Sequence, residues 1–287
     1  MGYNRALKAI NLESTDLIPA YRRGTDLAIC RPEFVKEMAG IDPRVDPEGA
    51  FLEMHRVLDI DLTFGGGILK KVEILDRTVY EDYKPPSDPD GSHIVLEGCK
   101  IARVPLGISY SEWVVERPFK TFNDLLEYLD GYDPYMRETR SVEEISREYQ
   151  SSHKEAQDPL GELTLVTGSW YHTLFMYFVD KFGLLLTIRL AYQRPKEFER
   201  LLDRFADLSR KNLEAWSRTD IKAMACHDDL ADSKGPLMPP AWFRKYIISR
   251  YPKVWEPIKR RGIKVIFLSD GEYSPLIDDI AKAGADG

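Results

Sequence analysis

From Leu17 onward, short apolar runs that suit β-strands alternate with longer amphipathic runs that suit α-helices, and this alternation limits the possible folds most strongly. The sequence predicts five such strands, near residues 17–21, 60–64, 162–168, 221–229 and 264–269. Strands that are separated by helices pair in parallel, and the helices then cover the sheet. Because several of these strands end in glycine or polar residues, the predicted fold class is α/β, a (β/α)8 barrel of TIM type.

The helices between these strands are predicted from apolar residues at three- and four-residue steps. A loop with Pro43, Pro47 and Gly49 precedes the third helix, and Pro252 and Pro257 are expected to kink or split the helix at 240–261. The predicted helices are residues 3–11, 32–39, 51–58, 121–129, 141–150, 184–192, 195–216, 240–261 and 275–283.

Residues 71–116 interrupt the alternation. Val, Ile, Tyr and Thr alternate there with polar residues, and residues 84–91 are rich in turn formers. We expect antiparallel strands at roughly 72–82, 92–97, 100–105 and 110–116. The predicted organisation is therefore a single domain over residues 1–287 with a β-rich insertion at 71–116, and we interpret the insertion as a candidate lid.

Composition excludes several classes of protein. The 40 Lys+Arg against 47 Asp+Glu give a net charge of −7, which disfavours nucleic acid as a partner. No apolar stretch approaches the roughly 20 residues that span a bilayer, and the first residues contain no signal-peptide core. The three cysteines are far apart, which is typical of a reducing compartment. We expect a cytoplasmic protein with no membrane contact, and the apolar helices leave a homodimer open.

The carboxyl ends of the predicted strands carry the candidate functional residues, because the working face of a parallel barrel lies there. These residues are Tyr21, Arg22, Arg23, 64–67, 168–171, 227–229, Ser269, Asp270 and Glu272. Arginine, carboxylate, imidazole and aromatic groups together suit a polar, anionic ligand. His227 and Asp229 share one side of their strand, but we favour other roles than metal binding for them.

Each candidate also has a purely structural interpretation. Arg22 and Arg23 can be a solvated pair, Asp270 can cap the following helix, and Tyr171 and Tyr177 can belong to the core.

Four segments resemble the uroporphyrinogen decarboxylase superfamily, which also contains cobalamin-dependent methyltransferases. Arg5 to Pro19 resembles the family's lead into its first strand, and residues 167–180 resemble its glycine turn and tyrosine helix. Residues 228–243 and 262–271 resemble its later strands. The resemblance implies a TIM barrel that binds a tetrapyrrole, or a small methylated substrate that is presented to one.

Decarboxylases of this family hold substrate carboxylates with arginines and the pyrrole NH groups with an aspartate. Arg22 matches one such arginine and Tyr177 matches the active-site tyrosine, but Gly65–Gly67 stands where that aspartate is expected. Asp228 and Asp229 add negative charge, which would repel a polycarboxylate. Porphyrinogen decarboxylation is therefore the alternative and not the first interpretation.

Zinc methyltransferases of this family use a His-x-Cys motif, and the matching positions here are Leu268 and Asp270. Zinc is therefore not expected, and no metal ligands are assigned. Our first hypothesis is corrinoid-linked methyl transfer in which Tyr177, Asp229 and Asp270 are catalytic. The aspartates would orient or protonate the substrate, and Tyr177 would donate a hydrogen bond. The expected substrate-binding residues are Arg22, Arg23, Gly66, Trp170 and Asp228.

The expected partners are a small-molecule or tetrapyrrole substrate and a corrinoid protein, with no covalently bound cofactor. A third interpretation is a non-catalytic barrel that binds a tetrapyrrole or a partner. Five barrel strands are visible and a sixth starts at Ala285, so the chain is expected to be incomplete at its C-terminus relative to the family.

Overall fold

A computed structural model describes residues 2–23, 32–64, 94–96, 99–106, 109–117, 119–125 and 140–287. The chain divides into two compact units. Unit one comprises residues 1–118 and 152–166, and unit two comprises residues 119–151 and 167–287. Helix α6 (Val142–Leu160) and strand β6 (Leu165–Trp170) each begin in one unit and end in the other. The predicted strand at 72–82 lies outside the described residues.

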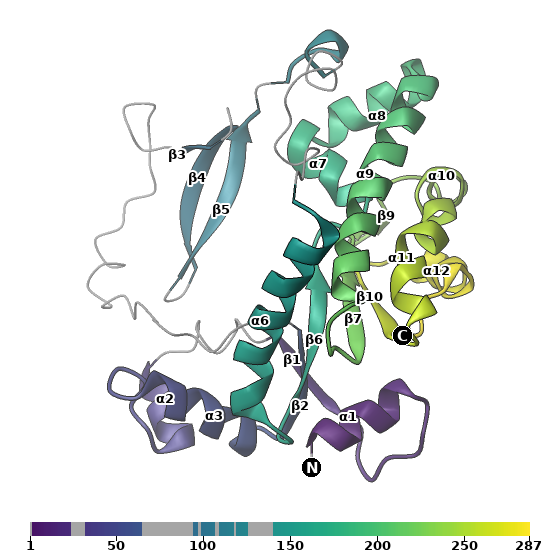
Figure 1. The fold of residues 1–287 in the computed structure, drawn as a ribbon. Helices are drawn as coiled ribbons and strands as arrows, with labels where there is room; N and C mark the ends of the chain where they lie inside the picture. Colours follow the sequence, from purple (N-terminus) through teal and green to yellow (C-terminus); the bar gives the residue numbers. More distant parts are fainter. Residues whose placement is uncertain are drawn as a thin grey trace. The chain divides into compact units, whose positions relative to one another are not determined.

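Among the described residues, unit one holds two short parallel strands, an antiparallel sheet and the helices α1, α2 and α3, together with the second half of α6 (Figure 1). Its further elements are α1 (Gly2–Ile10), β1 (Ala20–Arg23), α2 (Pro32–Ala39), α3 (Pro47–Val57), β2 (Ile60–Phe64), β3 (Ile94–Leu96), β4 (Cys99–Leu106) and β5 (Ser109–Glu116). Strands β3, β4 and β5 pair in that order, antiparallel, which confirms the predicted β-rich character of this insertion.

Strand β1 starts three residues later than predicted. Leu17 and Ile18 are apolar but exposed, and pairing with β2 begins only at Ala20. Pro19 explains the shift, because proline has no N–H to donate to a neighbouring strand. The buried Asp61 then fixes the start of β1, since its carboxylate accepts the Ala20 N–H at 2.8 Å and the Arg5 guanidinium at 2.8 Å.

Helix α3 begins earlier than predicted, because the expected loop is in part its first turn. Asp46 caps this helix and accepts the Gly49 N–H at 2.9 Å, and Pro47 occupies the first turn. Proline fits this position because the first N–H groups of a helix have no partner within it. The apolar face of α3 packs Ala50, Phe51 and Met54 into the core of unit one.

Unit two is built on three parallel strands. Its further elements are α7 (Phe175–Phe182), α8 (Leu184–Gln193), α9 (Pro195–Trp216), β7 (Ala223–His227), β8 (Ala231–Asp232), β9 (Gly235–Pro236), α10 (Pro240–Tyr246), the 3-10 turn Ile248–Arg250, α11 (Tyr251–Arg260), β10 (Lys264–Leu268), the 3-10 turn Ser274–Leu276 and α12 (Ile277–Ala283). Strand β7 lies between β6 and β10. Trp170 is paired with Cys226, and His227 with Leu268, so the three strands end close together.

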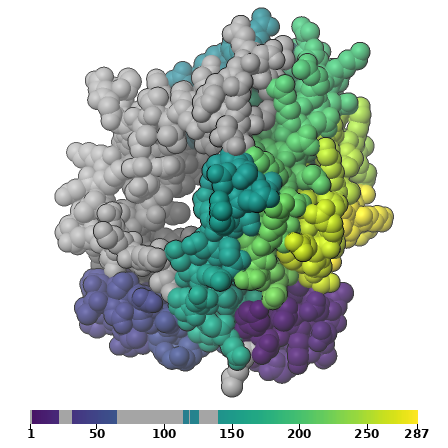
Figure 2. Space-filling model, in the orientation of Figure 1, coloured from purple at the N-terminus to yellow at the C-terminus, as the bar shows by residue number. Residues whose placement is uncertain are grey.

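Helices α9 and α11 lie side by side over this sheet and contribute to the green-to-yellow surface in Figure 2. Ion pairs join them, Arg210 to Glu256 at 3.1 Å and Arg260 to Glu214 at 2.9 Å. Beneath these pairs, the apolar faces of both helices pack on the strands in one aromatic-rich core. The long helix predicted to open at Pro195 is confirmed, and so is the interruption of the helix at 240–261.

Two predictions in this region are wrong. The helix predicted at 141–150 continues to Leu160 as α6; Ala156 and Leu160 extend its apolar face into the core of unit one. Gly168 lies inside β6 and not in a turn. A Cβ atom at this position would come within 2.7 Å of the Ile221 and Met224 side chains, so tight packing explains the glycine.

The segment Ala285–Gly287 runs along β10, as the predicted sixth strand requires. The Asp286 N–H donates to the Val265 carbonyl at 2.8 Å, and the Phe267 N–H donates to the Gly287 carbonyl at 2.8 Å. The Asp286 carboxylate also accepts the Val265 N–H at 2.9 Å. Among the described helices, none has the length and apolar character needed to cross a membrane.

Candidate functional site

The carboxyl ends of β6, β7 and β10 meet at one edge of the unit-two sheet. Three hydrogen bonds hold the segments that follow these strands. The Thr173 N–H donates to the His227 carbonyl at 3.0 Å, and the Asp228 N–H donates to the Leu268 carbonyl at 2.9 Å. The Ser269 hydroxyl accepts the Leu230 N–H at 3.0 Å. Side chains on these segments are therefore held in fixed positions by the sheet.

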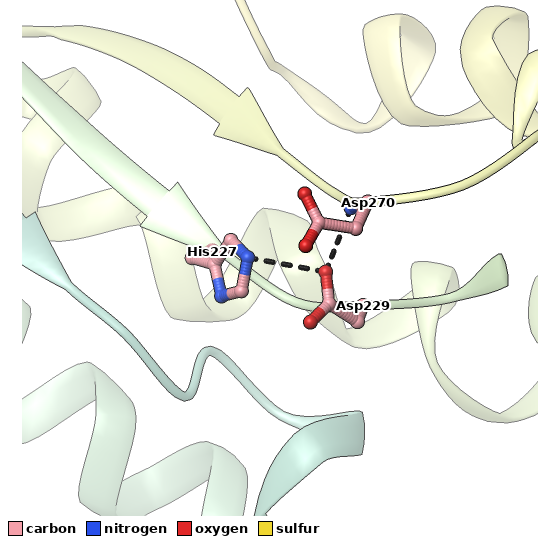
Figure 3. A group of neighbouring side chains, drawn as sticks. All are labelled: His227, Asp229 and Asp270. Carbon is pink, nitrogen blue, oxygen red and sulfur yellow. Dashed lines mark hydrogen bonds and ion pairs between the residues drawn. The ribbon is translucent and has the colours of Figure 1, made fainter. Parts of the chain in front are cut away.

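His227, Asp229 and Asp270 gather at this edge, and their side chains point toward one another (Figure 3). The His227 Nε2 and Asp229 Oδ1 atoms are 3.1 Å apart, and the same Oδ1 accepts the Asp270 N–H at 2.7 Å. His227 and Asp229 are half-buried, whereas Asp270 is exposed. We call these three residues the β7–β10 cluster.

The contact between His227 and Asp229 shifts the pKa values of both residues. Burial disfavours the charged imidazole, but the hydrogen bond and charge of Asp229, with the Tyr171 carbonyl 3.3 Å from Nδ1, raise the pKa of His227 above its usual value. Burial likewise disfavours the Asp229 carboxylate, yet His227 and the Asp270 N–H outweigh it and lower the pKa of Asp229. Asp229 is therefore suited to orient a substrate and poorly suited to donate a proton.

Asp228 points away from this cluster and is fully buried. Its carboxylate accepts the N–H groups of Leu174, Phe175 and Met176 at 3.1, 2.8 and 2.7 Å, and the Tyr251 hydroxyl at 2.9 Å. It thus caps the first turn of α7. Burial raises the pKa of Asp228, although these hydrogen bonds oppose the shift. Both oxygens are occupied inside the protein, so substrate binding by Asp228 stays a prediction that this geometry does not favour.

Trp170 and Tyr177 lie near the same edge, each partly buried against the core. The Trp170 indole N–H donates to the Ser209 hydroxyl at 3.1 Å, and the Tyr177 ring stacks on Phe205 with centroids 5.0 Å apart. The two rings are 6.4 Å apart. The aromatic packing agrees with the core interpretation of Tyr177, and its catalytic role stays a prediction.

A second histidine–aspartate pair lies close by. His172 Nε2 pairs with Asp180 of α7, and the exposed Tyr171 ring stands between the two histidines. Its centroid is 4.8 Å from His172 and 4.4 Å from His227, on which it is stacked. Sequence reasoning left His172 out.

The remaining predicted residues belong to unit one. Arg22 and Arg23 lie in β1, with their backbones paired to Thr63 and Phe64 of β2, while their side chains lie outside what the structure describes. Gly66 also lies outside the described residues. Their predicted roles therefore stay predictions.

His227 was a strand-end candidate, but neither a catalytic nor a binding role was predicted for it. The signal was present in the sequence, because residues two apart at a strand end share a side, and this spacing joins His227 to Asp229. What the sequence did not show is that Asp270, from the next strand along the sheet, completes the group.

Comparison with known families decides the relationship. The family model for uroporphyrinogen decarboxylase (URO-D) matches residues 114–287, which is more than half of the chain. The chain belongs to the uroporphyrinogen decarboxylase family. This confirms the resemblance given by residues 167–180, 228–243 and 262–271, all of which lie inside the matched region.

Two relatives of this URO-D chain show how far the likeness extends. A curated uroporphyrinogen decarboxylase from Syntrophotalea carbinolica is 29% identical over 115 residues, which cover 39% of this chain and 32% of the relative. The chain thus spans about a third of that relative's length. A solved methyltransferase from Methanosarcina mazei has a TM-score of 0.58 at 16% identity, over 100% of this chain and 74% of that one. This structural match confirms the predicted α/β barrel class.

Proposed function

We propose that this URO-D chain transfers a methyl group from a small methylated substrate to a corrinoid that a partner protein presents. The observation that carries the proposal is the β7–β10 cluster at the carboxyl ends of neighbouring parallel strands, where enzymes of this fold class place their chemistry. The solved methyltransferase supports the choice of methyl transfer only through its similar fold.

The charge of the cluster favours a small substrate over a polycarboxylate. Asp229 is held as a carboxylate by His227 and by the Asp270 N–H, and Asp270 adds a second acidic group. Among the described residues, no lysine or arginine is ion-paired with either aspartate. Two carboxylates that have no lysine or arginine partner among the described residues repel a substrate with many carboxylates but accept a neutral or cationic methyl donor.

In the proposed reaction the corrinoid is a substrate. Its reduced cobalt supplies the electron pair for the new bond to the methyl carbon, and the pair of the broken carbon–oxygen or carbon–nitrogen bond stays on the leaving atom. That atom takes a proton through the cluster, whose exposed member Asp270 is open to solvent. Asp229 orients the donor by accepting a hydrogen bond.

Decarboxylation of a porphyrinogen is the second candidate, because the curated relative from Syntrophotalea carbinolica bears that name. It would require cations that hold substrate carboxylates. The predicted ones are Arg22 and Arg23, whose side chains lie outside what the structure describes. A barrel that binds such a ligand without turnover is the third candidate.

The test gives the full chain two substrates in parallel. In one arm, chemically reduced cobalamin is mixed with methanol, a methoxyarene or a methylamine, and methylation is followed by absorbance. In the other arm, uroporphyrinogen is supplied and the loss of carboxyl groups is followed by chromatography. We expect turnover in the first arm only, lowered at least about tenfold by Asp229→Asn or Asp270→Asn.

Asp278→Asn is the matched control, because Asp278 is an exposed aspartate on α12 of the same unit. Decarboxylation without methyl transfer would overturn the first proposal in favour of the second. Spectral binding of either tetrapyrrole without turnover would favour the third candidate. Unchanged methyl transfer in both cluster variants would remove the roles given to the two aspartates.

A further inference from the structure

The β7–β10 cluster has a second property, which does not depend on methyl transfer. The imidazole of His227 and the carboxylates of Asp229 and Asp270 each offer one donor atom, and these three atoms lie within 4.8 Å of one another (Figure 3). His227 is the last residue of β7, Asp229 follows two residues later, and Asp270 lies two residues after the end of β10; the two strands are paired over their full length. Each donor thus lies within two residues of a paired strand end.

The spacing of two of the donors, His227 and Asp229, fits one metal ion. Metal–nitrogen and metal–oxygen bonds of about 2.0–2.2 Å place neighbouring ligand atoms roughly 2.9–3.4 Å apart in octahedral or tetrahedral sites. His227 Nε2 and Asp229 Oδ1 are 3.1 Å apart. An ion between them would keep this separation, and the exposed Asp270 carboxylate, whose donor atom lies within 4.8 Å of the other two, would move toward the ion to complete a three-ligand face.

Both half-buried donors are oriented by a second contact. His227 places Nδ1 3.3 Å from the Tyr171 carbonyl, and with the proton on Nδ1 the lone pair of Nε2 faces the cluster. Asp229 Oδ1 accepts the Asp270 N–H at 2.7 Å. Metal-binding histidines commonly donate their other ring N–H to a backbone carbonyl or carboxylate, and ligating carboxylates accept further hydrogen bonds.

We propose that His227, Asp229 and Asp270 bind one divalent first-row transition cation, such as Mn²⁺ or Zn²⁺. One imidazole nitrogen with two carboxylate oxygens suits these ions better than Ca²⁺ or Mg²⁺, which prefer oxygen alone. Three protein ligands leave coordination positions open on the exposed side of Asp270, where a substrate oxygen or nitrogen can bind.

This donor set differs from the one that the sequence resemblance implied. That set is a histidine and a cysteine thiolate, and Leu268 and Asp270 stand at the matching positions. The cysteine of unit two cannot replace the thiolate, because Cys226 is buried and burial raises the pKa of its thiol to about 12. The proposed site therefore departs from the expectation that the chain has no metal ligands.

The test measures binding without any methyl donor or corrinoid. The full chain is treated with a chelator, dialysed, and titrated with Mn²⁺ alone while free Mn²⁺ is followed by electron paramagnetic resonance; Zn²⁺ is titrated by calorimetry. We expect one ion per chain. Asp270→Asn and His227→Ala should weaken binding at least about tenfold. Asp270 is exposed, so its variant should keep the wild-type circular dichroism spectrum.

His172→Ala is the matched control, because His172 also pairs with an aspartate at the same sheet edge. We expect it to bind Mn²⁺ within about twofold of the wild type. Absence of stoichiometric binding by the wild type would overturn the proposal, and so would equal weakening by His172→Ala and His227→Ala. Because this experiment measures metal binding, a chain that binds one ion but transfers no methyl group still supports the metal site. Methyl transfer by a chain that binds no ion would overturn the metal site alone.

Discussion

Asp228 illustrates how one residue at a strand end can serve the fold while its neighbour serves a site. It accepts three N–H groups of the α7 first turn and the hydroxyl of Tyr251, all within unit two. Asp229, the next residue, faces His227 and Asp270. Because successive residues in extended chain point to opposite sides, the two carboxylates are separated although they are adjacent in sequence.

Replacing Asp228 by alanine should therefore destabilise the protein without removing the β7–β10 cluster. The change leaves buried N–H groups without acceptors, at an expected cost of about 2–4 kcal/mol in the free energy of unfolding. Loss of the desolvation penalty of the carboxylate offsets part of that cost. Urea denaturation followed by circular dichroism measures the difference.

Tyr251→Phe is the control for this prediction, since it removes one of the four hydrogen bonds to Asp228 and should cost about 1 kcal/mol. If Asp228→Ala unfolded at the same urea concentration as the wild type, the assignment of Asp228 as the cap of α7 would be wrong. Sequence alone could not show this cap, because Phe175 and Asp228 are 53 positions apart.

At the scale of elements, the spacing of apolar residues predicted the helices and strands correctly where those residues all face one core. The strand at residues 60–64 and the helices at 32–39 and 195–216 are confirmed as β2, α2 and α9. The errors have local causes, Pro19 at β1 and Pro47 at α3. The predicted strand ends at Gly168, whereas β6 continues to Trp170, and the side chains that pack on Gly168, those of Ile221 and Met224, come from later in the sequence.

The segment after α12 gives a prediction about pH. Burial raises the pKa of Asp286, but the Lys259 ammonium at 2.6 Å, the Val265 N–H and the nearby Lys264 outweigh this and hold it below its usual value. An aspartate whose folded pKa is lowered stabilises the fold above its unfolded pKa of about 3.9. This stabilisation is lost as the pH falls through the lower, folded pKa.

We therefore expect Asp286→Asn to lower the free energy of unfolding. The loss should have its full size above about pH 5 and should shrink as the pH falls below about 4. Urea denaturation of both proteins between pH 3 and 7 measures the difference. In a Lys259→Met background the pH dependence should shrink, because the main cation is gone. If, in proteins that keep Lys259, the stability difference between Asp286 and Asp286→Asn stays constant with pH, the ion pair is not its cause.

At the scale of the whole molecule, the family relationship and the candidate site fall on the same unit. The region that matches the URO-D family, residues 114–287, contains all of unit two, and unit two contains the β7–β10 cluster. The sequence predicted one domain because the strand–helix alternation runs through the whole chain. It did not show the division into units, since α6 and β6 belong to both.

The two units have separate apolar cores among the described residues, and this predicts two steps in unfolding. The core of unit one is small and includes Phe51 and Met54, whereas that of unit two is larger and contains many aromatic rings in contact, such as Phe178 against Phe198 and Phe205. Because stabilisation grows with buried apolar area, unit one should unfold at lower urea. Four of the five tryptophans lie in unit two, so fluorescence reports mainly that unit, while circular dichroism reports both.

We expect circular dichroism to change before tryptophan fluorescence as urea increases. Met54→Ala should move the early change to lower urea, and Phe205→Ala should move the late change. Each variant should lose about 2–5 kcal/mol in the free energy of unfolding of its own unit, because both side chains are buried. The opposing factor is that α6 and β6 pass through both units and can transmit unfolding from one to the other. If the two signals coincide in the wild type and in both variants, this coupling dominates and the units form one cooperative structure.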